Sequence, residues 1–325
     1  MATQTPPSIT GTDEIRGRSL LGITELTKDE ILLILRHAHW LKVNRNSHRA
    51  SDRPFVGKTL ALIFEKPSLR TRVTFEVAIT ELGGSSIYLG QDIQLGKRET
   101  VPDIAANLSR WVDCVAARTF AHSTVEQLKE FGTAPVINAL SDLEHPCQAL
   151  ADLQTIGEHL SDPTNPNFES LKLVFVGDGN NVANSLIAAA ARVGMSFTLA
   201  CPPGYEPNAD ILRAAESLGT ANGAQITVSN DPLDAVQGAD AIYTDVWTSM
   251  GQEEEAEARI KAFAGFQINS TLVAAAKPGA IVMHCLPAHR EEEITSEVLD
   301  GPQSVVLDEA ENRLHAQKAL LALIL

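Results

Sequence analysis

Residues 59–72 read Thr-Leu-Ala-Leu-Ile-Phe-Glu-Lys-Pro-Ser-Leu-Arg-Thr-Arg, an apolar run followed at once by a polar, basic segment. The apolar run, residues 59–64, predicts a buried strand, and a helix is expected to begin near Thr71. Ser68 and Thr71 supply hydroxyls, Arg70 supplies a guanidinium group, and the first helical turn supplies backbone N–H groups without partners inside the helix. Such a segment is suited to a phosphate, although an ordinary helix cap followed by surface arginines has the same pattern.

Strands and helices alternate along the whole chain. Thr27-Lys28-Asp29-Glu30 is a capping box that opens an amphipathic helix, and Thr100 and Ser123, each three residues before an acid, are predicted to cap two later helices. The alternation predicts an α/β protein of two domains, each with a central parallel sheet flanked by helices and joined by interdomain helices. The predicted strands are residues 59–64, 85–89, 114–118 and 136–140, then 171–176, 196–201, 225–229, 240–245 and 280–285.

The domain boundary is expected in the Pro- and Asn-rich connection at residues 161–167, after a helix over about residues 147–160. The predicted domains are therefore residues 1–160 and residues 161–307. Residues 308–325 form a last helix with an acidic start and an apolar end, which we expect to pack back on the first domain. Helices of the second half are predicted to end at glycines such as Gly194 and Gly219.

Composition narrows the class of protein. With 325 residues and 44% hydrophobic content the chain is long enough for two such domains. The 26 Lys and Arg residues against 41 Asp and Glu residues give a net charge of −15, which opposes a general affinity for nucleic acid or an anionic membrane. The four cysteines form no CxxC pair, and the longest apolar run, residues 319–325, is too short to span a bilayer. We therefore expect a cytoplasmic protein without an export signal or a membrane anchor.

Ligands of open parallel sheets bind beyond the carboxyl ends of the strands, so the residues that follow each strand are the candidates for a site. In the first half, one strand ends at Arg118, which by itself is more often a solvated or salt-bridged residue. Another leads to His145-Pro146-Cys147-Gln148, where a proline opens a helix and His145 and Gln148 can hydrogen-bond a carbonyl or an amide. His145 can equally be a cap of that helix.

In the second half, Gly177-x-Gly179 suggests a dinucleotide fingerprint, but Val182 occupies the position of its third glycine. Asn180 or Asn181 can instead hold a small zwitterion. Asp245 ends a strand and suits a substrate ammonium, although an acid there can also be a helix cap. Residues 247–257 are a candidate lid.

The strand at residues 280–285 brings a thiol, Cys285, to the same edge, and the following Leu286-Pro287 bond is a candidate for the cis form. A buried, inert cysteine is the usual alternative. The spacing of five metal-capable residues fits no tetrahedral zinc template, so no metal is expected. These residues are His145, Cys147, His284, Cys285 and His289.

Four ordered motifs carry a resemblance to a known family. They read Ser68-Leu69-Arg70-Thr71-Arg72, His145-Pro146-Cys147-Gln148, Asp245-Val246-Trp247-Thr248-Ser249-Met250-Gly251 and His284-Cys285-Leu286-Pro287. On these motifs the chain resembles the aspartate/ornithine carbamoyltransferase family over nearly its whole length, and the last two motifs are similar to those of its ornithine branch. The resemblance implies transfer of the carbamoyl group of carbamoyl phosphate to the δ-amine of L-ornithine, giving L-citrulline and phosphate.

The resemblance also implies roles for single residues. For carbamoyl phosphate these are Ser68, Leu69, Arg70, Thr71, Gln94, Arg118, His145, Gln148, Cys285, Leu286 and Arg313. For ornithine they are Asn181, Asp245, Ser249 and Met250. Catalysis would depend on Arg118, His145, Asp245 and Cys285, with no cofactor and no metal, and the general base stays open. The family implies a homotrimer, or a multiple of trimers, in which Gln94 reaches the site of a neighbouring subunit.

Several alternatives remain at this point. A transferase for another amine, such as putrescine or an N-acylated ornithine, would share the motifs, because the lid residues choose the acceptor. A dinucleotide-dependent oxidoreductase and a non-catalytic binding protein come from other classes. Arginine biosynthesis is the expected direction, although degradation is compatible with the same residues. The functional hypothesis requires Arg70, Arg118, His145 and Cys285 to face one cavity.

Overall fold

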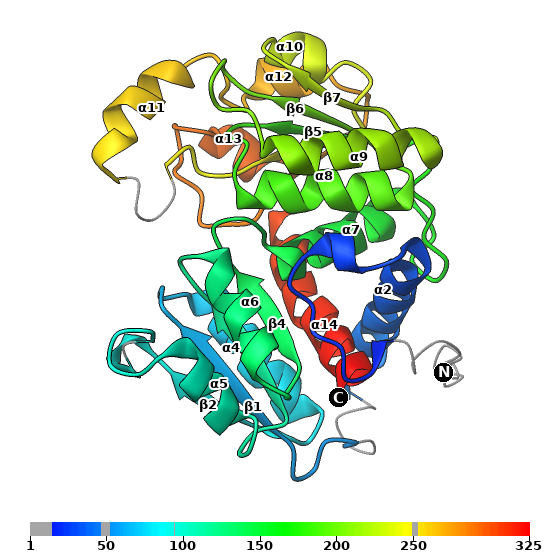
Figure 1. Ribbon diagram of the computed structural model, residues 1–325. Coiled ribbons are helices and arrows are strands. Elements are labelled where there is room, and N and C mark those ends of the chain that lie inside the picture. Colours follow the sequence, from blue (N-terminus) through cyan, green and yellow to red (C-terminus); the bar gives the residue numbers. More distant parts are fainter. Residues whose placement is uncertain (1–14, 47–52, 94, 249–252) are drawn as a thin grey trace. The chain divides into compact units, whose positions relative to one another are not determined.

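The computed structural model describes residues 15–46, 53–93, 95–248 and 253–325 (Figure 1). The chain divides into two compact units. Unit 1 contains the residues up to Gln154, Pro163–Pro166 and Glu311–Leu325, and unit 2 contains Thr155–Asp162 and Asn167–Ala310. The chain passes between the units within helix α7 (Pro146–Leu160), on either side of Pro163–Pro166, and within helix α14 (Val306–Ile324). Each unit holds one parallel sheet with helices packed on it, which confirms the predicted fold class.

Unit 1 is built on a four-stranded parallel sheet in the order β2–β1–β3–β4. Ala61 and Ile63 of β1 belong to an apolar cluster with residues of α5 and α6, and the alternate residues Leu60 and Leu62 are also fully buried. Because both faces of β1 are covered, the strand reads as a continuous apolar run. The elements are η1 (Ile23–Glu25), α2 (Lys28–Val43), β1 (Thr59–Phe64), α4 (Leu69–Glu81), β2 (Ser85–Leu89), η2 (Gln91–Ile93), α5 (Val101–Leu108), β3 (Cys114–Arg118), α6 (His122–Phe131) and β4 (Val136–Leu140).

Unit 2 is built on a five-stranded parallel sheet in the order β7–β6–β5–β8–β9. Figure 1 shows α8 and α9 side by side along this sheet. Val174 of β5 and Val282 of β9 lie in a buried cluster with Phe263. The elements are β5 (Lys172–Val176), α8 (Asn181–Val193), β6 (Ser196–Ala200), α9 (Ala209–Ala221), β7 (Ile226–Ser229), α10 (Pro232–Ala235), β8 (Ala241–Thr244), η3 (Glu253–Glu255), α11 (Ala256–Ala262), α12 (Ser270–Ala274), β9 (Ile281–His284) and α13 (Ser296–Leu299).

Two of the three predicted helix caps are confirmed. Thr27 closes a full capping box with Glu30, and the side chain of Thr100 accepts a hydrogen bond from the N–H of Asp103. The prediction for Ser123 is wrong, because α6 already begins at His122. Its N-cap residue is Ala121, whose side chain makes no capping hydrogen bond. The carboxylate of Asp142 instead accepts the hydrogen bond of the His122 N–H (2.7 Å). A residue distant in sequence thus satisfies this helix end, which a local pattern does not reveal.

The predicted helix end at Gly194 is confirmed, since this glycine is the C-cap of α8 and has a left-handed backbone conformation (φ 83°). The predicted end at Gly219 is wrong, because α9 continues to Ala221. A Cβ atom at Gly219 would lie 2.9 Å from Cγ1 of Ile226 in β7. The glycine therefore serves close packing of the helix against the strand.

Helix α14 begins two residues before the predicted Asp308. From Glu311 onward it belongs to unit 1, where the fully buried Lys318 donates a hydrogen bond to Glu81 at the end of α4 (3.0 Å). Within the described residues, each helix falls short of the length and apolar character that a bilayer crossing demands.

Candidate active site

Unit 1 has its topological switch point between β1 and β3, because β2 flanks β1 on one side and β3 and β4 follow on the other. A crevice for a ligand is expected outside the carboxyl ends of these two strands. Two hydrogen bonds tie the segments that leave them: the N–H of Glu65 donates to the carbonyl of Arg118 (2.9 Å), and the N–H of Phe120 donates to the carboxylate of Glu65 (2.8 Å). The candidate phosphate segment and Arg118 therefore share one edge of the sheet.

The candidate phosphate segment turns directly into α4. The helix begins at Leu69, two residues earlier than predicted, because Ser68 has an extended backbone and its hydroxyl accepts a hydrogen bond from the N–H of Thr71 (3.3 Å). Ser68 is thus a helix cap, as the alternative interpretation had it, and it also stands where an anion would meet the helix end. The side chain of Leu69 is 75% exposed, so what this residue offers an anion is its backbone N–H.

Helix α14 brings Arg313 to the same place. Its guanidinium group donates to the hydroxyl of Thr71 (3.0 Å) and to the side-chain oxygen of Gln148 (2.5 Å). Gln148 in turn donates to the carboxylate of Asp152 (2.8 Å), which fixes the orientation of its amide. Arg313 is only 3% exposed and Gln148 only 1%. Residues from α4, α7 and α14 thus form one buried hydrogen-bonded group.

His145 is buried, and the positive charges of three arginines act on it. Burial lowers its pKa well below the ordinary value, and the charges of Arg313, Arg118 and Arg70 lower the pKa further. The imidazole is therefore neutral near pH 7 and carries one N–H donor. Three guanidinium groups around a neutral imidazole form a strongly cationic centre in a chain whose net charge is −15.

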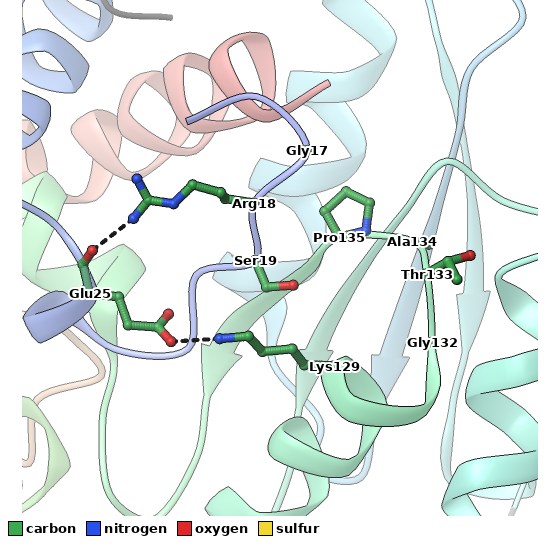
Figure 2. A pocket seen from close by; sticks show the side chains of 9 residues that line it. All are labelled: Gly17, Arg18, Ser19, Glu25, Lys129, Gly132, Thr133, Ala134 and Pro135. Atoms are coloured by element: carbon green, nitrogen blue, oxygen red, sulfur yellow. Dashed lines mark hydrogen bonds and ion pairs between the residues drawn. The ribbon is translucent and has the colours of Figure 1, made fainter. Parts of the chain in front are cut away.

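A second polar pocket of unit 1 differs from this centre in its charges (Figure 2). Its two cationic side chains are already engaged: Lys129 donates to the carboxylate of Glu25 (2.8 Å), and Arg18 donates to the carbonyl of Glu25 (2.8 Å) and to Glu30 (2.5 Å). These ion pairs hold the N-terminal segment on unit 1. They make the pocket a poor match for a free anion.

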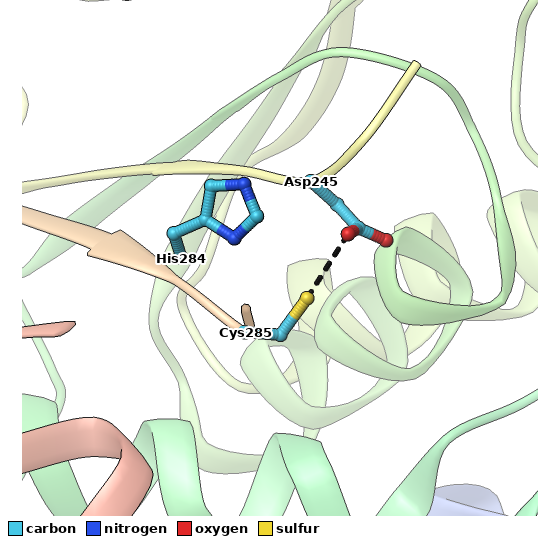
Figure 3. A group of neighbouring side chains, drawn as sticks. All are labelled: Asp245, His284 and Cys285. Atoms are coloured by element: carbon cyan, nitrogen blue, oxygen red, sulfur yellow. Dashed lines mark hydrogen bonds between the residues drawn. The ribbon is translucent and has the colours of Figure 1, made fainter. Parts of the chain in front are cut away.

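In unit 2 the switch point lies between β5 and β8. Asp245 directly follows β8 and Cys285 follows β9, and the thiol of Cys285 donates to the Asp245 carboxylate (3.1 Å, Figure 3). The other carboxylate oxygen accepts a hydrogen bond from the side-chain amide of Asn180, which follows β5 (2.9 Å). Asp245 is 8% exposed. The predicted acid and thiol of the second half are therefore brought together at the expected edge.

The glycines of Gly177-x-Gly179 have an explanation within the chain. A Cβ atom at Gly179 would lie 2.4 Å from the backbone nitrogen of Pro207, so glycine is needed for the contact with that segment. Asn180 is the N-cap of α8, and its side-chain oxygen accepts the N–H groups of Val182 (3.0 Å) and Ala183 (3.1 Å). Both ends of the Asn180 amide are thus in use within unit 2.

A buried pair supports the turn after β9. His284 and Glu293 are fully buried and hydrogen-bonded through Nε2 of the imidazole (3.0 Å), while Nδ1 accepts the N–H of Leu286 (2.9 Å). The second bond places the ring proton on Nε2. The Leu286–Pro287 peptide bond is cis, which confirms that prediction. Sequence reasoning missed Glu293, although it stands in the acidic run that follows the motif.

The metal-capable residues considered together at the outset belong to different units, His145 and Cys147 to unit 1 and the other three to unit 2. Asp245, His284 and Cys285 have ligand atoms within 4.8 Å of one another. Each of the three makes hydrogen bonds to protein groups there. Cys285 is bonded to Asp245, whereas His284 is bonded to Glu293 and to the backbone N–H of Leu286.

Three candidate residues lie outside the described residues, namely Gln94, Ser249 and Met250. The candidate lid, residues 247–257, is described only on either side of residues 249–252. Before that interval, Trp247 stacks on Phe263 (ring centroids 5.7 Å apart), and its carbonyl accepts a hydrogen bond from Arg259 (3.0 Å). Arg259 also pairs with Asp178 after β5 (2.8 Å). Sequence reasoning missed this arginine. Its one partner nearby in sequence is Glu255, four residues earlier, with which it forms an ion pair on the helix.

Comparisons with known proteins agree with this geometry. Residues 18–158 match the family model described as aspartate/ornithine carbamoyltransferase, carbamoyl-P binding domain, and residues 169–324 match the Asp/Orn binding domain of the same family. A protein named ornithine carbamoyltransferase from Geobacillus stearothermophilus is 51% identical over 312 residues, which cover 96% of this chain and 98% of that protein. One from Pyrococcus furiosus, named anabolic, is 51% identical over 316 residues, covering 96% and 97%.

A solved structure extends the similarity to three dimensions. The ornithine carbamoyltransferase from Pyrococcus furiosus superimposes with a TM-score of 0.90 at 51% identity, covering 95% of this chain and 97% of that one. The family models together span both halves of the chain, and the similarity extends over nearly all of it. The chain belongs to the aspartate/ornithine carbamoyltransferase family.

Proposed function

We propose that this protein transfers the carbamoyl group of carbamoyl phosphate to the δ-amine of L-ornithine, giving L-citrulline and phosphate. The proposal is carried by the buried group in which Arg313 contacts Gln148 and Thr71, with the charges of Arg70, Arg118 and Arg313 all acting on the buried His145. Three guanidinium groups whose charges act on one buried site create a positive potential that favours an anionic ligand. A phosphate that bears a neutral carbonyl and amide group matches the neutral imidazole and the amide of Gln148 beside them.

In this proposal the phosphate lies at the start of α4. The backbone N–H groups of the first turn and the hydroxyls of Ser68 and Thr71 would donate to its oxygens, and Arg70 would neutralise its charge. Arg118 would reach both the phosphate and the carbonyl oxygen. His145 and Gln148 would orient the carbamoyl group, and Arg313, which holds Thr71 and Gln148 in place, would complete the charge balance.

Unit 2 would supply the amine. The carboxylate of Asp245 suits the α-ammonium or the δ-amine of ornithine, and the thiol of Cys285 beside it would contact the reacting groups, as would the Leu286 carbonyl. Asn181 is proposed as the amide that contacts the amino acid on the strength of the family motif. Ser249 and Met250 are proposed as further contacts on the strength of the family motif.

The chemistry follows from the placement of charge. Attack of the neutral amine on the carbonyl carbon gives a tetrahedral oxyanion, which then expels phosphate. Donors from Thr71, Arg118 and His145 would stabilise that oxyanion, each by about 3 kcal/mol when well placed. Arg70 and the end of α4 would stabilise the departing phosphate. In this step the C–N bond forms and the bond between the carbonyl carbon and the phosphate oxygen breaks, and the proton lost by the amine ends on the departing phosphate as HPO₄²⁻; the mixed anhydride is already activated for this displacement.

The test is incubation of the purified protein with carbamoyl phosphate and one amine at a time, with citrulline and phosphate measured together. Ornithine should give one phosphate for each citrulline. Carbamoylation of putrescine or N-acetylornithine in preference to ornithine would assign the protein to the alternative amine. Binding of carbamoyl phosphate without any amine-dependent product would reject catalysis.

We further propose that the working form is a homotrimer in which Gln94 contacts the carbamoyl phosphate of a neighbouring subunit. Exposed apolar side chains on α4 and β2 support an interface there, since Leu69 is 75%, Val73 45% and Ile87 50% exposed in the isolated chain. Light scattering would give the mass in solution. Mixing inactive Arg70→Leu and Gln94→Ala chains after reversible dissociation should restore part of the activity, because some sites would then have both residues.

We also propose that the reaction runs toward citrulline for arginine biosynthesis. The word anabolic in the name of the Pyrococcus furiosus relative supports this direction. Expression of the protein in an arginine auxotroph that lacks carbamoyltransferase should restore growth without arginine. Failure to restore growth by a chain that is active in vitro would argue for a degradative role.

A further inference from the structure

Unit 2 has a second carboxylate at its switch point. Asp178 follows β5 within the segment Gly177–Gly179, and its side chain is 12% exposed. Oδ2 of this carboxylate accepts a hydrogen bond from the guanidinium group of Arg259 (2.8 Å). Within the residues that the structure describes, Oδ1 of Asp178 has no hydrogen-bond partner. Asp178 therefore keeps one carboxylate oxygen available to a ligand.

The backbone on both sides of Asp178 is fixed by hydrogen bonds. The N–H of Gly177 donates to the carbonyl of Ala200 (2.9 Å), and the N–H of Gly179 donates to the carbonyl of Tyr205 (2.9 Å). Gly177 has a positive φ (153°), a conformation that favours glycine. The place of the Asp178 side chain is therefore set by the backbone, and several bonds share in holding it.

Two contacts join this segment to the residues that follow β8. Nη1 of Arg259 donates both to Asp178 and to the carbonyl of Trp247 (3.0 Å), so one nitrogen atom bridges the two segments. The side-chain amide of Asn180 donates to Oδ2 of Asp245 (2.9 Å). A ligand is expected at the carboxyl ends of β5 and β8. Asp178 and Asp245 therefore lie on the two segments that border the expected crevice.

The two oxygens of Asp245 have different neighbours. Oδ1 accepts the thiol of Cys285 (3.1 Å), as Figure 3 shows, and Oδ2 accepts the amide of Asn180 (2.9 Å). In the proposed function Cys285 contacts the reacting groups, so the δ-amine belongs on the thiol side of Asp245. The α-ammonium then belongs on the side of Asn180, on the segment that carries Asp178.

Negative charge is in excess around this place. Among the described residues that these bonds join, three carboxylates and one guanidinium group meet, from Asp178, Asp245, Glu255 and Arg259. Burial raises the pKa of Asp178 above its ordinary value, and the charge of Asp245 adds to that rise against the opposing charge of Arg259. The carboxylates of Asp178 and Asp245 thus repel each other, and a bound cation would relieve that repulsion.

We propose that Asp178 is a binding residue for the acceptor, and that together with Asp245 it holds the α-ammonium of ornithine. The proposal rests on the proposed function and adds to it a reason why the acceptor must be a free amino acid. N-acylation removes the positive charge of the α-nitrogen, so an N-acylated ornithine would leave both carboxylates without a counter-charge. Asp178 therefore selects ornithine over its N-acylated form.

The first test removes the charge of Asp178 and keeps its shape. Asp178→Asn retains an oxygen that can accept the bond from Arg259, so the loss of charge is the main change. KM for ornithine should rise by about 10-fold, as expected for one lost hydrogen bond to a charged group. Both kcat and KM for carbamoyl phosphate should stay within about 2-fold of wild type, because the lost contact is made to ornithine before and during the reaction alike.

The second test uses two competing ligands to locate the effect on the substrate. L-Norvaline has the α-ammonium of ornithine but lacks the δ-amine, and 5-aminopentanoate has the δ-amine but lacks the α-ammonium. Asp178→Asn should raise the inhibition constant of L-norvaline by about 10-fold and leave that of 5-aminopentanoate unchanged. A loss of structure would weaken both ligands alike, so the ratio of the two constants separates binding from a structural role.

Asp240→Asn is the matched control. Asp240 also pairs with a cation, Lys277 (2.8 Å), but at the opposite end of β8. This variant should keep both inhibition constants. Unfolding midpoints of the two variants would be measured alongside.

Equal weakening of both ligands in Asp178→Asn would overturn the role of Asp178, as would unchanged constants for both. Weakening of 5-aminopentanoate alone would place the carboxylate at the δ-amine and would overturn the role as well. A failure of the proposed function is a different result, since it would show as a wild-type protein that forms no citrulline. A wild type that forms citrulline, with wild-type constants in Asp178→Asn, would overturn the role of Asp178 alone.

Discussion

The two units place their candidate residues by the same rule and give them opposite charge. In each unit most of the polar residues follow strands at or next to the switch point, namely β1, β3 and β4 in unit 1 and β5, β8 and β9 in unit 2. In unit 1 these positions bring arginines around a neutral histidine, whereas in unit 2 they bring a carboxylate beside a thiol. The topology thus decides where a ligand binds, and the side chains decide whether it is an anion or an amine.

The largest effect is expected from removing a cation of unit 1. Arg70→Leu should weaken carbamoyl phosphate binding by at least about 100-fold, because hydrogen bonds to charged groups contribute about 1.5–3 kcal/mol each. Titration calorimetry with carbamoyl phosphate alone measures this directly. Arg72→Leu is the matched control, since Arg72 is paired with Glu76 (3.0 Å) and lies over Tyr88. Unchanged affinity in Arg70→Leu would remove Arg70 from the anion site.

The corresponding change in unit 2 should affect the other substrate. Asp245→Asn removes the negative charge that faces Cys285 and Asn180, and it should raise KM for ornithine by about 10- to 100-fold, as expected for one lost charged partner. Steady-state kinetics with each substrate varied in turn would separate the two constants. A comparable rise in KM for carbamoyl phosphate would contradict the division of roles between the units. Asp240→Asn, before β8, is the control at the opposite end of the strand.

A smaller effect is expected at Arg259, which joins Asp178 after β5 to the carbonyl of Trp247 after β8. Arg259→Lys keeps the charge but cannot make these bonds and the one to Glu255 at once, because lysine lacks the planar fork of donors. KM for ornithine should rise by about 3- to 10-fold, as for one net hydrogen bond, with carbamoyl phosphate affinity unchanged. A variant with wild-type constants for both substrates would show that these bonds do not order the amine site.

The smallest effect concerns pH and stability. The pKa of His145 is well below its ordinary value in the folded protein, so the unfolded chain binds its proton first as the pH falls. The contribution of neutral His145 to the free energy of unfolding is therefore fully present above the unfolded pKa of about 6.5. Below that pH the contribution falls, by about 1.4 kcal/mol at pH 5.5. Urea unfolding at pH 8 and pH 5.5 should show a smaller drop for His145→Gln than for wild type. Equal drops would mean that His145 is protonated in the folded protein.

Much of the fold could be predicted from the sequence because its signals are local. The central strands of the two parallel sheets are buried on both faces and read as apolar runs, and the observed bounds of all nine strands agree with the predicted ones to within one residue. Thr27 and Gly194 mark helix ends through contacts within a few residues. Ser123 misled the prediction because the bond at that helix start comes from Asp142, 20 positions after His122, and Gly219 did so because its contact is with Ile226 of β7, a strand outside the helix.

The difference between local signals and contacts with other elements also decides which residues of the candidate site the sequence could reveal. Ser68, Arg70, His145 and Cys285 could be found because they follow predicted strands and lie in recognisable motifs. Arg259 and Glu293 act on backbone or side chains that come from other elements, as in the bond from Arg259 to Asp178 across 81 positions of the chain. Such pairs leave no periodicity or spacing in the sequence, and only the folded chain brings them together.

The most direct test of carbamoyl transfer is to observe the new bond. Carbamoyl phosphate labelled with ¹³C and ornithine labelled with ¹⁵N at the δ-position would be incubated with the protein and followed by NMR. The account predicts a citrulline signal split by coupling between the two labels, growing in step with phosphate. Release of phosphate with the ¹³C label found elsewhere, and no coupled signal, would contradict it.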